Sequence, residues 1–360
     1  MALSIAIVGL PNVGKSTLFN ALTGSNILAA NYPFATIEPN TGMVPVPDPR
    51  LQVLSDQNKA QKIIPATVTF VDIAGLVAGA SEGEGLGNQF LSHIRTTNAI
   101  VQVVRAFDDP NVTHVDDAHD PRKDIDVINT ELVLADLQTV SKRLPKVTKE
   151  ARINPKLKPA ADALAAVNKI LNDDDPLWNH PELDAELLAD LQLLTMKPII
   201  YLFNVDEAGL GDSAKQAELQ KLVAPAVSLF VCAKLESELK DLEPDEAAEL
   251  LESYGQNESG LIQLIHAAYD VLGLQSYLTA GEKEVRAWTI HRGDTAPQAA
   301  GVIHGDFERG FIAAEIVSYP DLIEAGSISV ARSAGKLRTE GKTYVMHPED
   351  VVEFRFNVSK

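Results

Sequence analysis

The feature that most constrains the fold of this chain is a glycine-rich loop close to its N-terminus. The sequence GLPNVGKST, residues 9–17, follows the apolar, β-branched run 3–8 and precedes the helix-forming residues LFNAL. It matches the pattern GxxxxGK[ST], whose glycines allow successive backbone N–H groups to point at a phosphate. The start of the following helix adds a partial positive charge. A strand, a phosphate-binding loop and a helix in this order predict a Ras-like P-loop nucleotide-binding domain.

The loop residues have separate expected roles in binding a nucleotide. Lys15 should bridge the β- and γ-phosphates and stabilise charge during phosphoryl transfer, and the Ser16 hydroxyl should ligate Mg²⁺. The residues that we expect to contact the phosphates are Asn12, Val13, Gly14, Lys15, Ser16 and Thr17.

Four further apolar runs, 67–73, 99–104, 198–203 and 226–232, have the length of buried strands. Helical patterns lie between most of them, which predicts an α/β fold with a mainly parallel sheet covered on both faces. Ligand sites in such sheets lie at the carboxyl ends of the strands. Motif residues at these ends are therefore candidates for one shared site.

Three residues downstream of the loop are candidates for the metal and γ-phosphate end of this site. Asp72 ends a predicted strand and starts the sequence DIAG, so we expect it to hold Mg²⁺ through water. The N–H group of Gly75 can sense the γ-phosphate. An isolated threonine in NYPFATIEPN would be read as a surface residue, but the position of Thr36 between the two motifs favours a metal ligand.

Asn204, Val205 and Glu207 follow one predicted strand, and Ala233 follows the next, where they would contact the base. Guanine-specific domains use NKxD, whose aspartate accepts two hydrogen bonds from guanine. In Glu207 the carboxylate lies one methylene further out, which spoils that pair. Val205 replaces the lysine of NKxD and lacks the long aliphatic chain that packs over the base. We therefore expect weak GTP recognition, with backbone groups near Val205 and Ala233 as the base contacts.

Composition narrows the possible partners. The formal net charge of -19 argues against a general nucleic-acid binder. No apolar run approaches the length of a membrane span, and the N-terminus lacks a signal-peptide pattern. The single cysteine, Cys232, cannot form an internal disulfide, which fits a reducing compartment. We expect its thiol to be packed among apolar residues. We expect a cytoplasmic protein without a membrane or DNA partner.

Residues 131–195 do not belong to a minimal domain of this kind. Two sets of apolar residues recur there at helical spacing: Val133, Leu137, Val140 and Leu144, and then Leu164, Val167 and Leu171. Pro145, Pro155 and Pro159 separate the sets, which predicts an antiparallel helical hairpin with a broken tip. The residues from 277 onward, rich in short strands and turns, read as a separate small α+β domain.

Five segments together resemble the YchF family of Obg-like, ribosome-associated ATPases. They are GLPNVGKST, NYPFATIEPN, DIAGLVAGASEGEGLGNQFL, VINTELVLADL and EVRAWTIHRGDTAPQAAGVIH. The resemblance implies an Obg-type G domain (1–130 and 196–276), a coiled-coil hairpin (131–195) and a TGS domain with a β-grasp fold (277–360). It also implies ATP as the preferred nucleotide, ADP as product, and the ribosome as partner.

The catalytic residue is the least defined part of the site. Ras-type enzymes orient the attacking water with a glutamine after DxxG, where this chain has Leu76. The resemblance places a candidate catalytic histidine at His114, although a loop histidine is otherwise read as solvent-exposed. In some related GTPases an asparagine at the position of Asn12 accompanies K⁺ beside the phosphates, so K⁺ joins Mg²⁺ as an expected cofactor.

A basic segment, 142–158, stands out in this acidic chain. Seven positive residues and one acid give it a charge of +6. A solvated helical tip is the simpler interpretation of a charge run, but the implied ribosome association favours contact with ribosomal RNA. The positive residues are Lys142, Arg143, Lys146, Lys149, Arg152, Lys156 and Lys158.

Three functions fit these patterns to different degrees. We favour an ATPase that acts as a nucleotide-dependent switch on a large partner. A binding module that carries nucleotide with little turnover is the alternative, and Leu76 lends it support. A small-molecule kinase is disfavoured because the chain combines the DxxG sequence at residues 72–75 with the sequence NVDE at residues 204–207.

Overall fold

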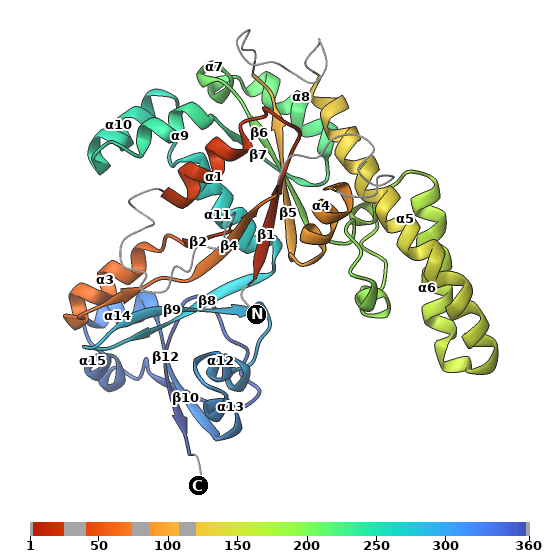
Figure 1. Cartoon of the computed structure of the whole chain (residues 1–360). Helices are drawn as coiled ribbons and strands as arrows, with labels where there is room; N and C mark the ends of the chain where they lie inside the picture. The colour runs from red at the N-terminus through yellow and green to blue at the C-terminus, as the bar shows by residue number, and fades with distance from the viewer. Residues whose placement is uncertain (1–2, 25–40, 74–85, 108–119, 358–360) are drawn as a thin grey trace. The chain divides into compact units, whose positions relative to one another are not determined.

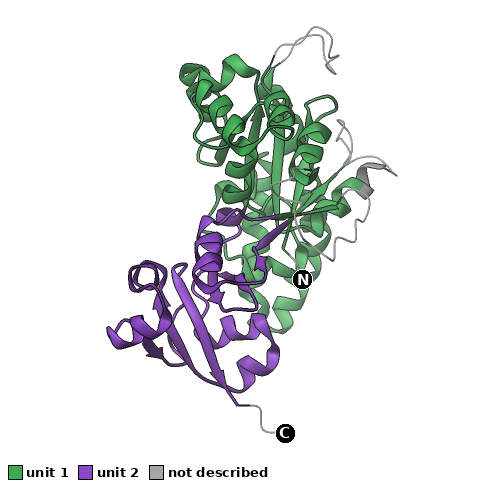
Figure 2. Ribbon diagram, turned by 90° about the vertical axis from the view of Figure 1, so that its left-hand side faces the viewer, with its two compact units in different colours: residues 1–44, 69–268 green, residues 45–68, 269–360 purple. Residues whose placement is uncertain are grey.

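The computed structural model of the 360-residue chain describes residues 3–24, 41–73, 86–107 and 120–357 (Figure 1). The chain divides into two compact units (Figure 2). The first comprises residues 1–44 and 69–268, and the second comprises 45–68 and 269–360. The second unit therefore begins before residue 277 and also takes up a segment that the sequence assigned to the G domain. None of the described helices combines the length and apolar character that a bilayer crossing requires.

The first unit contains a six-stranded sheet in the order β2-β4-β1-β5-β6-β7. The strands from β4 to β7 pair in parallel, as predicted from the apolar runs. Strands β5 and β6 are buried along their whole length, which explains their mostly apolar sequences. The bounds are β1 (Ser4–Val8), β2 (Thr41–Pro45), β4 (Thr67–Asp72), β5 (Ala99–Arg105), β6 (Ile199–Asn204) and β7 (Val227–Val231).

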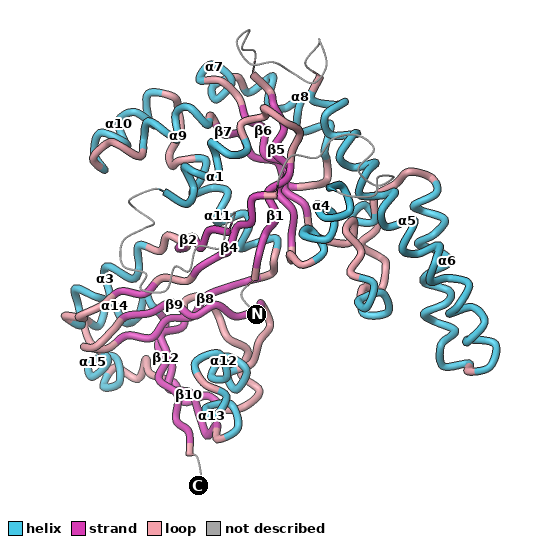
Figure 3. The backbone as a smooth tube through the Cα atoms, viewed as in Figure 1, coloured by secondary structure: helices cyan, strands magenta, loops and turns pink. Residues whose placement is uncertain are grey.

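Helices alternate with these strands, so the predicted α/β class is confirmed (Figure 3). After β1 the chain moves to β4 on one side, and it then crosses to β5 on the other side of β1. Such a reversal opens a crevice at the carboxyl end of β1, where ligands bind in open α/β sheets. The helices are α1 (Lys15–Gly24), α4 (Leu86–Arg95), α5 (Pro121–Ile153), α6 (Lys158–Asn172), α7 (Glu207–Gly211), α8 (Ser213–Val223), α9 (Ala233–Leu239), α10 (Pro244–Ser253) and α11 (Gly260–Val271).

Helices α5 and α6 form the predicted hairpin, although α5 starts at Pro121 rather than near residue 131. Val133, Val140 and Val147 recur every seven residues on α5 and are buried in one cluster with Leu164 and Leu171 of α6. After α6 the chain continues through two short 3-10 helices, η2 (Leu177–Asn179) and η3 (Glu186–Leu191), which add leucines to the same cluster.

The predicted break at Pro145 was wrong, whereas Pro155 and Pro159 do lie at the turn between α5 and α6. Pro145 lies inside α5, which continues to Ile153 and is followed by η1 (Pro155–Leu157). A proline in a helix interior removes one hydrogen bond and costs about 3 kcal/mol. The helix persists because Val140 and Val147, on either side of the proline, are packed against α6. Pro145 therefore does not interrupt the helix, and the basic residues between 142 and 153 are helical.

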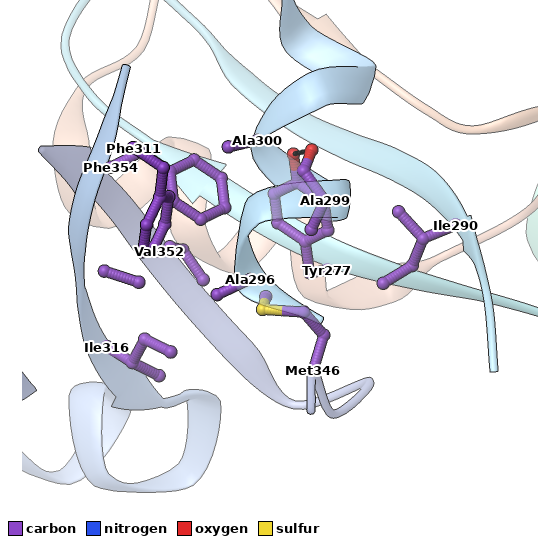
Figure 4. Close-up of a cluster of buried hydrophobic side chains, with 11 residues drawn as sticks. Tyr277, Ile290, Ala296, Ala299, Ala300, Phe311, Ile316, Met346, Val352 and Phe354 are labelled. Atoms are coloured by element: carbon purple, nitrogen blue, oxygen red, sulfur yellow. Dashed lines mark hydrogen bonds between the residues drawn. The ribbon is translucent and has the colours of Figure 1, made fainter. Parts of the chain in front are cut away.

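The second unit is a mixed sheet in the order β11-β10-β12-β8-β9-β3, flanked by short helices. Its core includes Tyr277, which is fully buried and donates to the carbonyl oxygen of Ala299 at 3.0 Å (Figure 4). The strands are β3 (Ile63–Ile64), β8 (Leu274–Ala280), β9 (Val285–His291), β10 (Phe311–Ser318), β11 (Arg338–Glu340) and β12 (Asp350–Phe356). The helices are α3 (Pro49–Asn58), α12 (Ala296–Ile303), α13 (Gly305–Arg309), α14 (Tyr319–Ala325) and α15 (Ile328–Ser333).

Candidate nucleotide-binding site

The glycine-rich loop joins the carboxyl end of β1 to the first turn of α1 (Figure 1). Asn12 and Gly14 both have positive φ angles, 62° and 90°, and the N–H of Leu18 donates to the carbonyl oxygen of Gly14 at 3.0 Å. A Cβ on Gly14 would lie 2.3 Å from the Nδ2 atom of Asn204. The second glycine of the motif is therefore required both by its backbone conformation and by the close approach of a neighbouring side chain.

Lys15 and Asp72 are brought together by the pairing of β1 with β4, in which Ile7 lies opposite Asp72. The Nζ atom of Lys15 donates a hydrogen bond to Oδ1 of Asp72, and only 8% of Lys15 is exposed. The parallel register thus places the carboxylate of the DxxG sequence beside the phosphate-binding lysine.

The oxygen donors at this point fit a magnesium ion. Ser16 is exposed on the first turn of α1, and Asp72 is half-buried. Mg²⁺ prefers hard oxygen ligands and is usually held by one or two protein groups together with phosphates and water. The described residues contain no group of three or more His, Cys, Asp or Glu side chains placed to hold a metal ion.

Asn204 connects the phosphate loop to the loop after β7. Its Nδ2 atom donates to the carbonyl oxygen of Val13 at 2.9 Å, and its Oδ1 atom accepts from the N–H of Ala233 at 3.1 Å. The side chain is only 3% exposed. Asn204 is thus a buried brace between two parts of the site, and the side-chain bonds that the structure gives it go to protein backbone.

The backbone N–H groups expected to contact the base are engaged within the protein. The N–H of Val205 donates to the carbonyl oxygen of Val231 at 2.9 Å, and that of Ala233 donates to Asn204. Both side chains are buried, with exposed fractions of 2% and 7%. Base recognition by these two N–H groups would require them to share their present bonds.

Glu207 is paired with Lys234, the second residue of α9. The Nζ atom of Lys234 lies 2.7 Å from Oε1 of Glu207, and this hydrogen bond lowers the pKa of the Glu207 carboxyl below its ordinary value. Asp206 has a different role, because its Oδ1 atom accepts from the N–H of Gly209 and caps α7. Neither carboxylate is thus a free counterpart of the guanine-binding aspartate.

Four residues singled out in the sequence, Thr36, Gly75, Leu76 and His114, lie outside the described part of the chain. Among the described ones, Thr17 is exposed on the first turn of α1, and Asn12 is exposed in the loop before it. The pairing of Glu207 with Lys234 was missed from the sequence. The only signal for it is that both positions follow the carboxyl ends of adjacent strands.

Two family models match this chain. Residues 4–153 match a family described as 50S ribosome-binding GTPase. Residues 274–357 match the YchF-GTPase C-terminal family, which is described as a protein of unknown function.

Full-length relatives and a solved structure extend this match. The chain is 50% identical to the Ribosome-binding ATPase YchF of Bacillus subtilis, covering 99% of this chain and 100% of the relative. It is 49% identical to the protein of the same name from Haemophilus influenzae, with the same coverage. The structure of the Schizosaccharomyces pombe YchF GTPase matches with a TM-score of 0.88 and 39% identity, covering 98% of this chain and 97% of that one. With these matches running along nearly its whole length, the chain belongs to the YchF family.

Proposed function

We propose that this chain is an Mg²⁺-dependent ATPase that converts ATP to ADP and phosphate and uses its nucleotide state to control binding to the ribosome. The names of the bacterial relatives, Ribosome-binding ATPase, support both the nucleotide and the partner. The observation that carries the proposal is the phosphate loop itself, with its positive-φ glycine, its buried lysine and the adjacent Asp72.

The preference for ATP rests on the base end of the site. Guanine recognition by an NKxD aspartate depends on a free carboxylate that accepts two hydrogen bonds. Here the carboxylate is longer by one methylene and is bound by Lys234 at 2.7 Å. GTP would have to break this ion pair to gain its usual contacts, whereas adenine has no paired donors for which the carboxylate is needed.

Hydrolysis follows from the roles of individual residues. The Lys15 side chain and the backbone N–H groups of residues 12–17 bind the β- and γ-phosphates. Ser16 and Thr36 would hold Mg²⁺ directly and Asp72 would hold it through water, and the bound ion would supply positive charge beside the phosphate oxygens. Gly75 contacts the γ-phosphate, and His114 orients the attacking water in place of the absent glutamine. K⁺ near Asn12 would add a further positive charge.

The basic face of the hairpin is the proposed contact with ribosomal RNA. Lys142, Lys146, Lys149 and Arg152 are exposed on the last turns of α5, and Lys156 and Lys158 follow on η1 and α6. Arg143 completes the set and pairs with Asp190 at 3.2 Å. In an acidic molecule such a face would orient the hairpin toward phosphate.

A phosphate-release assay under multiple turnover tests the enzyme. Wild type should release phosphate from ATP only with Mg²⁺. Lys15→Ala and Ser16→Ala should each lower the rate by at least about 100-fold, because they remove phosphate charge neutralisation and a metal ligand. Lys169→Ala, an exposed lysine on α6, is the control and should keep the wild-type rate. Tight ATP binding with no turnover in wild type would instead support the binding module.

A further inference from the structure

A second pocket, separate from the phosphate loop, lies where α4 meets α5 and η3. It has a volume of about 430 Å³ and is open to solvent. Helix α4 contributes Ser92 and Arg95, and η3 closes one end with a leucine. Four residues of α5 complete the polar wall: Gln138, Thr139, Lys142 and Arg143.

All three charged side chains that line this pocket are cations, in a chain of net charge -19. Lys142 makes no ion pair with any described residue. Arg143 pairs with Asp190 at 3.2 Å, and these side chains are 38% and 63% exposed. Exposed pairs of this kind contribute little stability, so Arg143 can turn toward an anion at small cost.

Arg95 is held in position by neutral groups. Its guanidinium donates to Oγ1 of Thr139 at 3.0 Å and to the carbonyl oxygen of Gln192 at 3.2 Å. The nearest buried acid, Asp136, is instead engaged by the N–H groups of Leu194 and Thr195. A fixed guanidinium without a hydrogen-bonded carboxylate keeps its positive charge available to the pocket.

We propose that this pocket binds a phosphate group, either of an RNA backbone or of a free oligophosphate. Three cations around one cavity suit an anion that carries more than one negative charge or several acceptor oxygens, and arginine in particular matches phosphate geometry. The Thr139 hydroxyl on the same wall donates to the carbonyl oxygen of Ala135 at 3.0 Å and accepts from Arg95, so its role is to hold the guanidinium in place. A phosphate bound there contacts α4 and α5 at once, so it joins the helix that follows the DIAG segment to the hairpin.

The test uses the full-length protein with saturating ADP in magnesium-free buffer, so that the phosphate loop is filled and pyrophosphate chelates no metal. Pyrophosphate is titrated by calorimetry, and a fluorescein-labelled RNA 12-mer by anisotropy. The double variant Lys142→Gln/Arg143→Gln should weaken binding at least about tenfold, since two charge-assisted contacts are lost. Lys169→Gln, which removes one positive charge from an exposed position of α6 outside the pocket, should bind as wild type does.

Further arms distinguish the sources of the phosphate and separate this pocket from the hairpin tip. Weakening of both probes assigns the pocket to phosphate from either source, and weakening of pyrophosphate alone assigns it to a free oligophosphate. Weakening of RNA alone is already expected from the proposed hairpin contact, which includes Lys142 and Arg143, and would overturn the pocket as a phosphate site. A variant with Lys146, Lys149, Arg152 and Lys156 changed to glutamate should keep its pyrophosphate affinity, because none of these residues lines the pocket. The proposal is overturned if wild type binds neither probe, or if the double variant binds both as wild type does while its melting temperature is unchanged.

Discussion

The Nδ2 atom of Asn204 lies only 2.3 Å from the point that a Cβ on Gly14 would occupy. The same amide bonds the carbonyl oxygen of Val13 and the N–H of Ala233, so it links the phosphate loop to the loop that follows β7. A glycine in the motif and an asparagine about 190 positions later are thus parts of one packed arrangement. This explains why an asparagine is needed in a motif that is usually described as reading the base.

Removing that amide should loosen the site. Asn204→Ala leaves the Val13 carbonyl and the Ala233 N–H without their buried partner, at about 1–3 kcal/mol for each unsatisfied group. We expect a lower melting temperature and ATP binding weakened at least about tenfold, measured by differential scanning fluorimetry and equilibrium titration. The control is Asn257→Ala in the exposed loop before α11, which should change neither quantity. Unaltered ATP affinity in Asn204→Ala would mean that the brace does not shape the site.

The Glu207–Lys234 pair predicts a shift in nucleotide preference. Glu207→Asp shortens the side chain, weakens its contact with Lys234 and frees a carboxylate of the length that guanine requires. The ratio of the GTP Kd to the ATP Kd should therefore fall by about tenfold, which corresponds to one good hydrogen-bonded contact. Competition titrations with unlabelled nucleotides measure it. Glu238→Asp, the same change at an exposed position of α9, should leave the ratio as it is. A wild type that already prefers GTP would contradict the proposed ATP preference.

Charge reversal on the hairpin should act on ribosome binding alone. Changing Lys146, Lys149, Arg152 and Lys156 to glutamate alters the local charge by eight units, so co-sedimentation with ribosomes should weaken and its salt dependence should flatten. Basal ATP hydrolysis should stay close to wild type, since these residues lie outside the nucleotide site. If co-sedimentation is the same across a salt series, the RNA contact lies elsewhere.

Glu236 predicts a pH-dependent stability. It is 6% exposed and accepts from the N–H of Gly260 at 2.7 Å, and burial raises the pKa of its carboxyl from 4.5 to about 7. The folded chain holds this proton at pH values where the unfolded chain has lost it, so the free energy of unfolding falls as pH rises through this window. This contribution to the free energy of unfolding is fully present below pH 4.5 and fully lost above about pH 7. The loss is at most ~3 kcal/mol.

The variant Glu236→Gln removes this ionisation. Its stability relative to wild type should therefore increase between pH 5 and pH 8, as followed by urea unfolding at several pH values. Glu238→Gln on the exposed side of α9 should show no such trend. A stability difference that does not vary with pH would show that Glu236 stays ionised throughout.

The sequence predicted five strands of this sheet because each is a mostly apolar run that is too short for a helix. β1, β4, β5, β6 and β7 lie within about a residue or two of the expected ranges. β2 was missed, since Thr41–Pro45 contains a glycine and a proline and alternates between buried and partly exposed positions. Pro145 was misread because local propensity favours a break, and only the packing of valines against α6 keeps the helix intact.

The contacts of the site were harder to predict than its residues. The motifs indicate which side chains belong to the site, but the bonds of Asn204 to Val13 and of Lys234 to Glu207 depend on strand order and register. A pair such as β3 with β9, in which Ile63 lies opposite Val285, joins segments more than 200 residues apart. Nothing in the pattern of residues 63–64 indicates that partner.

The placement of residues 45–68 in the second unit means that the polypeptide passes between the units three times. Leu51 and Leu54 of α3 are buried, and Arg50 of the same helix donates to the carbonyl oxygen of Pro348 at 2.6 Å. A fragment that starts at residue 269 would lack α3 and β3, and its β9 would become a bare sheet edge. The C-terminal unit is therefore not a module that can be cut away or transplanted as one continuous piece. The chain between Thr36 and Asp72 includes residues 45–68. Two of the three expected magnesium-binding positions are therefore connected by a segment that folds as part of the second unit.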